Sequence, residues 1–298
     1  MCGVAGIIAA GSQTLGTDLL DMLQLVQHRG LDATGVAIYE KRDHVKLRVA
    51  MPSPEFVGIL RDLVSQHARE IEHKVYQGQG IFTFYEASLD IDAAEIPLLH
   101  TVVNAHPKLC VHSIGKSIAV YKDQGHAVDI RARHEIRPTA GTHGIGHVRL
   151  ATESAEDINA AHPFVTPHYP ELAIVHNGQF TNYFNMRRFL ESKGTQFKTR
   201  NDSEMAAHYI GWQMGSQGLS LQDALAASLE DLDGIFTILA STPTELGFVK
   251  DRLAIKPLLL FEQDGVTLFG SEQISLTPIF DDVFADEMDP GTVNVWSL

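Results

Sequence analysis

The first part of the chain alternates short apolar runs with one helical repeat. Small and apolar residues at 3–9 predict a buried strand. Leucine, methionine and valine then recur at helical spacing, and Thr17 or Asp18 is the residue we expect to cap this helix. A turn at 28–32 follows. Further strands are expected at 34–39, 145–151 and 172–176.

The second half of the chain places helices before strands. Helices are predicted at 182–193, 203–215 and 221–232, and strands at 235–241, 246–250, 257–262 and 266–270. Gly194 ends the first of these helices, and Ser220 with Asp223 resembles a capping box at the third. Strands, then helices, then strands indicate an α+β fold with helices packed on antiparallel sheets.

The stretch from about 45 to 138 has a pattern of its own. It predicts a strand at 45–50, a helix at 55–69, a strand at 80–87, a helix at 92–104, and a hairpin of 109–114 with 117–122. An order resembling βαββαβ is typical of a small ferredoxin-like unit. We therefore predict one domain over 1–298, interrupted by a ferredoxin-like α+β insertion at about 45–138.

Composition and charge exclude several classes of protein. Of the 298 residues, 44% are apolar, which is too high for a disordered chain. A formal charge of -14 disfavours binding to nucleic acid or to an anionic membrane, because both need a basic surface. The two cysteines do not make a disulfide framework. A cytoplasmic location is therefore expected.

Cys2 is the strongest candidate for chemistry. Once the initiator Met1 is removed, its thiol lies beside its own α-amino group. An α-amine has a pKa of about 7.7–8.0 in peptides, so near neutral pH it can accept the thiol proton and later return it. Met-Cys-Gly also occurs where a thiol is simply buried at the start of a strand. Other residues of the site are therefore needed to distinguish a nucleophile from a buried structural thiol.

Four other residues supply what an amide substrate with amino-acid ends would need. Asn177 and Gly178, after a predicted strand, offer an amide side chain and a backbone N–H for an oxyanion. Arg149 can hold a carboxylate with its guanidinium fork. Asp202 can hold an ammonium group, can be a helix N-cap, or can do both. A zinc pair of His143 with the histidine at 147 is disfavoured, because glycines interrupt that stretch.

Together these pieces resemble the class II, or N-terminal nucleophile, glutamine amidotransferase family. The matching motifs are Met-Cys-Gly-Val-Ala-Gly at 1–6, His-Arg-Gly-Leu-Asp at 28–32, Gly-His-Val-Arg-Leu-Ala-Thr at 146–152, Ala-His-Pro at 161–163, His-Asn-Gly-Gln at 176–179, Asn-Asp-Ser-Glu at 201–204, Lys-Asp-Arg-Leu-Ala-Ile-Lys-Pro-Leu at 250–258 and Gly-Ser-Glu at 270–272. The resemblance implies a four-layer αββα sandwich, and hydrolysis of L-glutamine to L-glutamate and ammonia through a Cys2 thioester.

The resemblance also implies roles for individual residues. Cys2 would be the nucleophile, with Asn177 and Gly178 as the oxyanion hole. The substrate-binding residues it implies are Arg149 for the carboxylate, Asp202 for the amine, Thr152 at the pocket wall and Arg29 as a brace for the N-terminal cysteine. Residues 153–161 match a loop that folds over bound glutamine.

Some residues differ from the family pattern, and these differences argue against one type of family member. Leu150 and Glu153 stand where members similar to glucosamine-phosphate synthase have Trp and His, and Ala33 stands where the family often has Ser. No motif of a fused acceptor module is found, so we expect the ammonia acceptor site on another polypeptide.

Among stand-alone members, the chain resembles the amidotransferase subunits related to glutamate synthase, such as the one that belongs to N-methylglutamate synthase. This implies a hetero-oligomer with two partner chains, one large and flavin-binding and the other small and β-helical, into which ammonia is channelled. FMN and an iron–sulfur cluster would lie on those partners, with no cofactor or metal in this chain. The alternative is a non-catalytic subunit, with Met1 retained, that binds glutamine or glutamate and assembles or regulates the complex.

Overall fold

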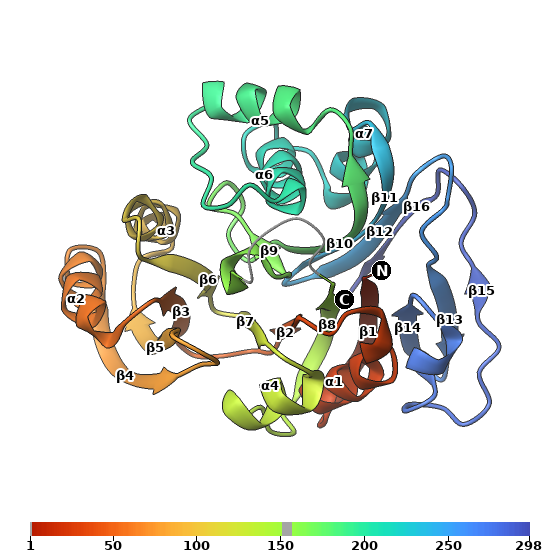
Figure 1. Ribbon diagram of the computed structural model, residues 1–298, viewed down its shortest axis with the longest axis horizontal. Coiled ribbons are helices and arrows are strands. Elements are labelled where there is room, and N and C mark those ends of the chain that lie inside the picture. The colour runs from red at the N-terminus through yellow and green to blue at the C-terminus, as the bar shows by residue number, and fades with distance from the viewer. Residues whose placement is uncertain (1, 151–156) are drawn as a thin grey trace.

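Two antiparallel sheets lie face to face at the centre of the molecule, with helices on both outer faces (Figure 1). The computed structural model describes residues 2–150 and 157–298. A third sheet with two helices of its own lies beside the central layers. This arrangement confirms the predicted αββα sandwich with an inserted ferredoxin-like segment.

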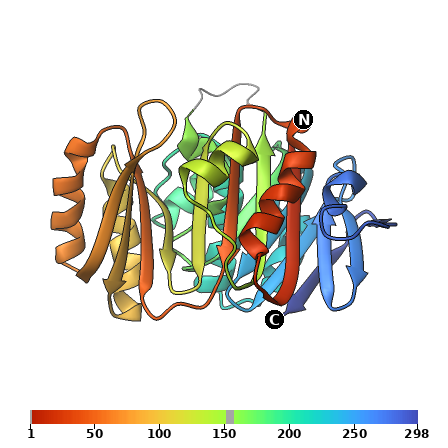
Figure 2. The ribbon, with the colours of Figure 1, turned by 90° about the horizontal axis from the view of Figure 1, so that it is seen from below.

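The first central sheet has the strand order β15-β13-β14-β1-β8-β2-β7. Its strands are β1 (Gly3–Ser12), β2 (Ala33–Tyr39), β7 (Ile118–Gln124), β8 (Gly141–Arg149), β13 (Leu259–Gln263), β14 (Val266–Gly270) and β15 (Asp286–Glu287). Helices α1 (Leu15–Leu25) and α4 (Ala127–Arg133) cover its outer face (Figure 2). β1 is an interior strand, paired with β14 on one side and β8 on the other.

The second central sheet has the order β16-β12-β11-β10-β9. Its strands are β9 (Phe164–Val165), β10 (Ala173–Phe180), β11 (Gly234–Thr242), β12 (Glu245–Lys250) and β16 (Val293–Ser297). Its outer face is covered by α5 (Tyr183–Ser192), α6 (Asp202–Gly215) and α7 (Leu221–Asp231). The apolar side chains of these helices form one core with the sheet. Helices α5 and α7 are amphipathic, whereas α6 is buried along most of its length.

Between the two sheets lies a core of strand side chains. It includes Val4, Ile145, Val175, Leu239 and Phe248, all of them buried. Each such side chain contributes roughly 1.5–3 kcal/mol on burial. Because the central strands are covered on both faces, their sequences read as continuous apolar runs.

The inserted unit has the order βαββαβ. Its elements are β3 (Val45–Met51), α2 (Val57–Ser65), β4 (Arg69–Gln77), β5 (Thr83–Asp90), α3 (Ile96–Ala105) and β6 (Cys110–Gly115). They form a four-stranded antiparallel sheet in the order β4-β5-β3-β6, with a separate core that joins the sheet to both helices. This strand order is the ferredoxin-like one.

The predicted details of this unit need two corrections. The helix expected at 55–69 is shorter, because a strand, β4, begins at Arg69. The hairpin expected from 109–114 and 117–122 is wrong, because β6 pairs with β3 in the third sheet whereas β7 pairs with β2 in the first. Residues 118–133 of the segment predicted as an insertion therefore lie in the central layers.

Helix α1 also begins earlier than expected. The carbonyl of Thr14 accepts the N–H groups of Thr17 and Asp18, so these two residues lie in the first turn rather than at the cap. Across the described parts of the chain, no helix combines the length and the apolar character needed to cross a membrane. Short 3-10 turns complete the structure at Gln27–Arg29, Pro54–Phe56, Ala93–Glu95, Ile158–Ala160 and Gln273–Leu276.

Candidate active site

The predicted site residues meet where strands of both central sheets end. Cys2 directly precedes β1, and Gly3 lies opposite Val148 of β8, whose last residue is Arg149. In the facing sheet, β10 carries Asn177. Its side-chain amide donates a hydrogen bond of 3.2 Å to the carbonyl oxygen of Cys2, which joins the two sheets at this point.

Two side chains hold the backbone of Cys2. Besides Asn177, Arg29 donates from Nε to the same Cys2 carbonyl oxygen at 3.0 Å, while Arg29 Nη1 forms an ion pair of 2.6 Å with Glu272. Arg29 is buried and Cys2 is half-buried. Partial burial works to raise the pKa of Glu272, but hydrogen bonds from Arg29 and His28 lower it below its ordinary value. A charged Glu272 therefore compensates the buried guanidinium.

Gly178 follows Asn177 and has a conformation that requires glycine. Its φ is +150°, and a Cβ at this position would lie 1.9 Å from the carbonyl oxygen of Ile235 on the neighbouring strand β11. The absence of a side chain therefore lets β10 approach β11 closely just after the amide of Asn177. The backbone at Asn177 and Gly178 is therefore packed closely against β11.

Asp202 is the first residue of α6, and the structure separates it from the capping role. The N-cap is Asn201, whose side-chain oxygen accepts the Ser203 N–H at 2.8 Å. The Asp202 carboxylate instead accepts the backbone N–H of Phe180, at the end of β10, at 3.1 Å. A carboxylate at a helix N-terminus is stabilised by the helix dipole. The Asp202 carboxylate therefore lies beside the strand that carries Asn177 and Gly178.

Arg149 places a positive charge near Cys2. The residue is buried, and this burial lowers the pKa of its guanidinium, whereas interactions with Cys2, Asp32 and Asp157 act in the opposite direction. The carbonyl of Arg149 also accepts the Asp32 N–H at 3.0 Å. The site therefore contains a partly desolvated cation, which is the state in which a carboxylate ligand is bound most strongly.

A column of buried histidines behind these residues was not anticipated. The rings of His147 and His162 stack with centroids 4.0 Å apart, and those of His162 and His176 are 6.3 Å apart. Burial lowers all three pKa values, that of His147 to about 3, so these rings are neutral near pH 7. The signal in the sequence was that each one lies inside a recognised motif, although no motif assigns it a role.

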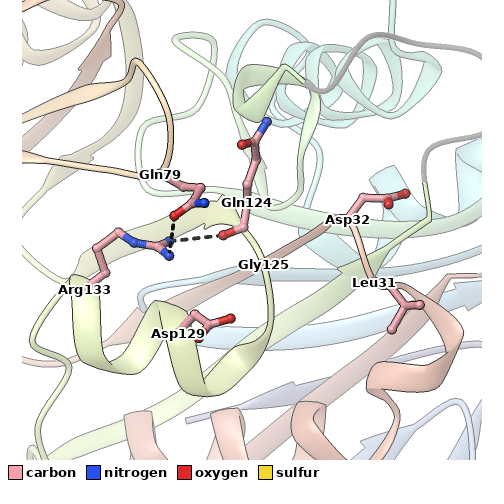
Figure 3. A pocket seen from close by; sticks show the side chains of 7 residues that line it. All are labelled: Leu31, Asp32, Gln79, Gln124, Gly125, Asp129 and Arg133. Carbon is pink, nitrogen blue, oxygen red and sulfur yellow. Dashed lines mark hydrogen bonds between the residues drawn. The ribbon is translucent and has the colours of Figure 1, made fainter.

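A polar pocket of about 390 Å³ lies beside the site (Figure 3). Its lining residues are Leu31, Asp32, Gln79, Gln124, Gly125, Asp129 and Arg133. Arg133 bonds to Gln124 O at 3.1 Å and to Gln79 Oε1 at 3.0 Å, which ties the inserted unit to the β7–α4 turn. Asp32 connects this pocket to the site, because its N–H bonds the Arg149 carbonyl.

Some of the predicted residues are not described by the structure. Met1, Thr152 and part of the loop predicted over glutamine, 153–156, lie outside the described residues. In residues 2–150 and 157–298, no group of three or more His, Cys, Asp or Glu side chains is placed to hold a metal ion. His143 stacks on Tyr39 and bonds the Thr242 carbonyl at 2.7 Å.

Comparison with known proteins shows the family to which the chain is similar. Residues 147–278 match the glutamine amidotransferase domain family. A predicted glutamine amidotransferase of Methanothermobacter thermautotrophicus is 32% identical, with 100% of each chain covered. The glutamine amidotransferase-like protein GlxB of Rhizobium meliloti is 36% identical, covering 99% of this chain and 98% of that protein.

Solved structures agree on the fold. The glutamine phosphoribosylpyrophosphate amidotransferase of B. subtilis superimposes with a TM-score of 0.64 at 21% identity, over 99% of this chain and 47% of that one. A second structure, an allosteric regulatory enzyme of purine biosynthesis, gives a TM-score of 0.63 at 22% identity, over 99% of this chain and 46% of that one. The chain thus has the N-terminal nucleophile hydrolase fold of class II amidotransferases. It belongs to the glutamine amidotransferase family.

Proposed function

We propose that the chain is a glutaminase subunit that hydrolyses L-glutamine to L-glutamate and ammonia, with Cys2 as the nucleophile. The observation that carries the proposal is the convergence on Cys2. Its carbonyl is held at once by Arg29 and by Asn177 from the facing sheet. A residue whose backbone is fixed from two directions can present its thiol and amine in one orientation.

The reaction would proceed in two halves. After Met1 is removed, the free α-amine of Cys2 takes the thiol proton, and the thiolate attacks the carboxamide carbon of glutamine. The resulting oxyanion accepts hydrogen bonds from the Asn177 side chain and the Gly178 N–H. The C–N bond then breaks as the α-ammonium of Cys2 protonates the leaving nitrogen, which departs as ammonia. Water, deprotonated by the same amine, hydrolyses the thioester to glutamate and regenerates the thiol.

Arg149 and Asp202 would bind the amino-acid end of the substrate. The Arg149 guanidinium would pair with the α-carboxylate, and the Asp202 carboxylate with the α-ammonium. Each charge-assisted hydrogen bond of this type contributes roughly 1.5–3 kcal/mol. Thr152 would line the same pocket, and Arg29 would act through Cys2. The two charged groups select a free amino acid over a plain amide.

The ammonia would pass to a glutamate-synthase-like partner, with this chain as the amidotransferase component of N-methylglutamate synthase. Two relatives that match this chain over nearly their whole length support a stand-alone amidotransferase. Leu150 stands where members similar to glucosamine-phosphate synthase have Trp, and this argues against that type of member. FMN and an iron–sulfur cluster would lie on the partners, one large and flavin-binding and the other small and β-helical, in the cytoplasm. No step at Cys2 uses them.

The test combines intact mass with glutaminase turnover, measured on the full chain with its co-purified partners. We expect a mass without Met1, glutamate release, and a loss of roughly 10³-fold or more in Cys2→Ala. Cys110→Ala is the matched control, because Cys110 is buried in β6 and burial raises the pKa of its thiol to about 11. Retained Met1 with glutamine binding but no turnover would instead establish the non-catalytic, ligand-binding alternative.

A further inference from the structure

The His176 ring lies between the two halves of the candidate site. On one side, His176 Nδ1 lies 2.7 Å from Ser203 Oγ, next to Asp202 in α6. On the other, a Cβ on Gly178 would lie 2.9 Å from His176 Nε2, so this ring atom faces the glycine backbone. The ring also stacks on Phe180, whose N–H bonds the Asp202 carboxylate. The buried His176 side chain therefore connects its own motif, at 176–179, with the motif at 201–204.

The hydrogen-bond pattern favours one tautomer of His176. Ser203 Oγ donates to Asp202 Oδ1 at 3.4 Å, and a hydroxyl group has one hydrogen to donate. With that hydrogen directed to Asp202, the contact of 2.7 Å between Ser203 Oγ and His176 Nδ1 requires the proton on Nδ1. In that tautomer Nε2, the ring atom that faces the Gly178 backbone, carries no proton, and it has no donor or acceptor partner among the described residues. Burial of the ring lowers its pKa and keeps it neutral.

From this geometry we infer that His176 is a positioning residue for Asp202, acting through the hydroxyl of Ser203 in the order His176 Nδ1–H, Ser203 O–H, Asp202 carboxylate. The inference rests on the proposed function, in which Asp202 binds the α-ammonium of glutamine. The Ser203 hydroxyl group donates to one oxygen of the Asp202 carboxylate, and the Phe180 N–H donates to the other. Asp202 is thereby fixed in one rotamer before the substrate arrives.

The kinetic consequence falls on substrate binding. Asp202 would contact a part of glutamine that does not change during the reaction, so its misplacement weakens ground state and transition state alike. We expect Ser203→Ala to raise KM for glutamine about 10-fold with kcat changed by less than about threefold. Ser203→Thr keeps the hydroxyl and is expected to restore KM.

Two histidine variants form a matched pair. The amide nitrogen of Asn occupies the place of Nδ1, whereas that of Gln reaches the place of Nε2. We therefore expect His176→Asn to keep KM within about threefold of the parent and His176→Gln to raise it about 10-fold. Equal effects of both variants on KM, or a loss confined to kcat, would overturn the positioning role.

A spectroscopic measurement tests the same inference without turnover. ¹⁵N NMR of the histidine rings in full-length Cys2→Ala protein, with His176 assigned by its absence in the double variant with His176→Asn, reports the protonated nitrogen. We expect the proton on Nδ1 at pH 7 and a shift of that signal in Ser203→Ala. A proton on Nε2 would refute the inference, whereas lack of glutaminase activity with a proton on Nδ1 would refute only the proposed function.

Discussion

Arg29 donates a hydrogen bond of 3.0 Å to the carbonyl oxygen of Cys2, across 27 positions of sequence. The same guanidinium is anchored by Glu272, 243 positions away in the other direction. The backbone of the candidate nucleophile is thus fixed by residues from three distant parts of the chain. This relationship gives the first prediction.

Arg29→Lys should lower kcat/KM for glutamine by roughly 10- to 100-fold. The ammonium group of lysine is a single point charge and cannot contact the Cys2 carbonyl and Glu272 through a rigid fork at the same time. Steady-state glutaminase assays test this, with Arg131→Lys as the control, because Arg131 is exposed and bonds Asp21 on the surface. Unchanged kcat/KM in Arg29→Lys would show that the brace is not needed.

Gly178→Ala should abolish turnover and destabilise the fold by roughly 1–3 kcal/mol or more. The new methyl group would collide with the carbonyl of Ile235, and φ would be unfavourable as well. Urea unfolding and activity assays measure both effects. Gly58→Ala is the control. That glycine lies in α2 with open space around it, so the change should stabilise the folded protein by about 0.4–1 kcal/mol.

Stability should fall as the pH is lowered from 6.5 toward 4. Burial lowers the pKa of His100 and of His147 to about 3, whereas in the unfolded chain both titrate near 6.5. Between these values the unfolded state binds more protons, so acid favours unfolding by up to about 1.4 kcal/mol per pH unit for each histidine.

Urea unfolding at pH 7 and pH 5 measures this pH dependence. His100→Leu should make it shallower, since it removes one buried titrating ring and, at α3, lies outside the candidate site. An identical pH dependence in His100→Leu and in the parent protein would contradict the assignment of this effect to buried histidines.

Arg48→Ala should destabilise the protein by roughly 2–5 kcal/mol, because it leaves a cavity at a buried position and removes one partner of Glu86, which keeps its ion pair with Lys46 at 2.9 Å. Arg48 of β3 is 2% exposed, pairs with Glu86, donates to the Val120 carbonyl at 2.9 Å and lies 4.0 Å from the Tyr121 ring. It thereby connects the inserted unit to β7. Arg69→Ala, which breaks an exposed pair with Asp90, should change stability by less than about 0.5 kcal/mol in the same denaturation assay.

Sequence patterning predicted the central layers well because their strands are buried on both faces. It missed β4 because this is an edge strand with mostly exposed residues, and its charged side chains hide the alternation of Ile71, His73 and Val75. It joined β6 and β7 into a hairpin because proximity along the chain does not reveal that two strands enter different sheets.

The candidate site was predicted through motifs, and the structure brings Cys2, Asn177 and Arg29 together in direct contact. What motifs could not supply was the supporting geometry. The histidine preceding Asn177 has an ordinary place in the sequence, and its contact with Ser203 depends on how α6 docks against β10. The N-cap role was left open for Asp202 and belongs to its neighbour Asn201, since either residue type caps helices.

The way β2 and β7 pair explains how an additional unit can be carried at this point of the fold. Tyr39, the last residue of β2, lies opposite Ile118, the first residue of β7. If the intervening segment were absent, these strands would be joined by a tight turn. The ferredoxin-like unit is therefore an enlarged hairpin loop in topological terms, and its gain or loss in evolution would leave every strand pairing of the first sheet intact.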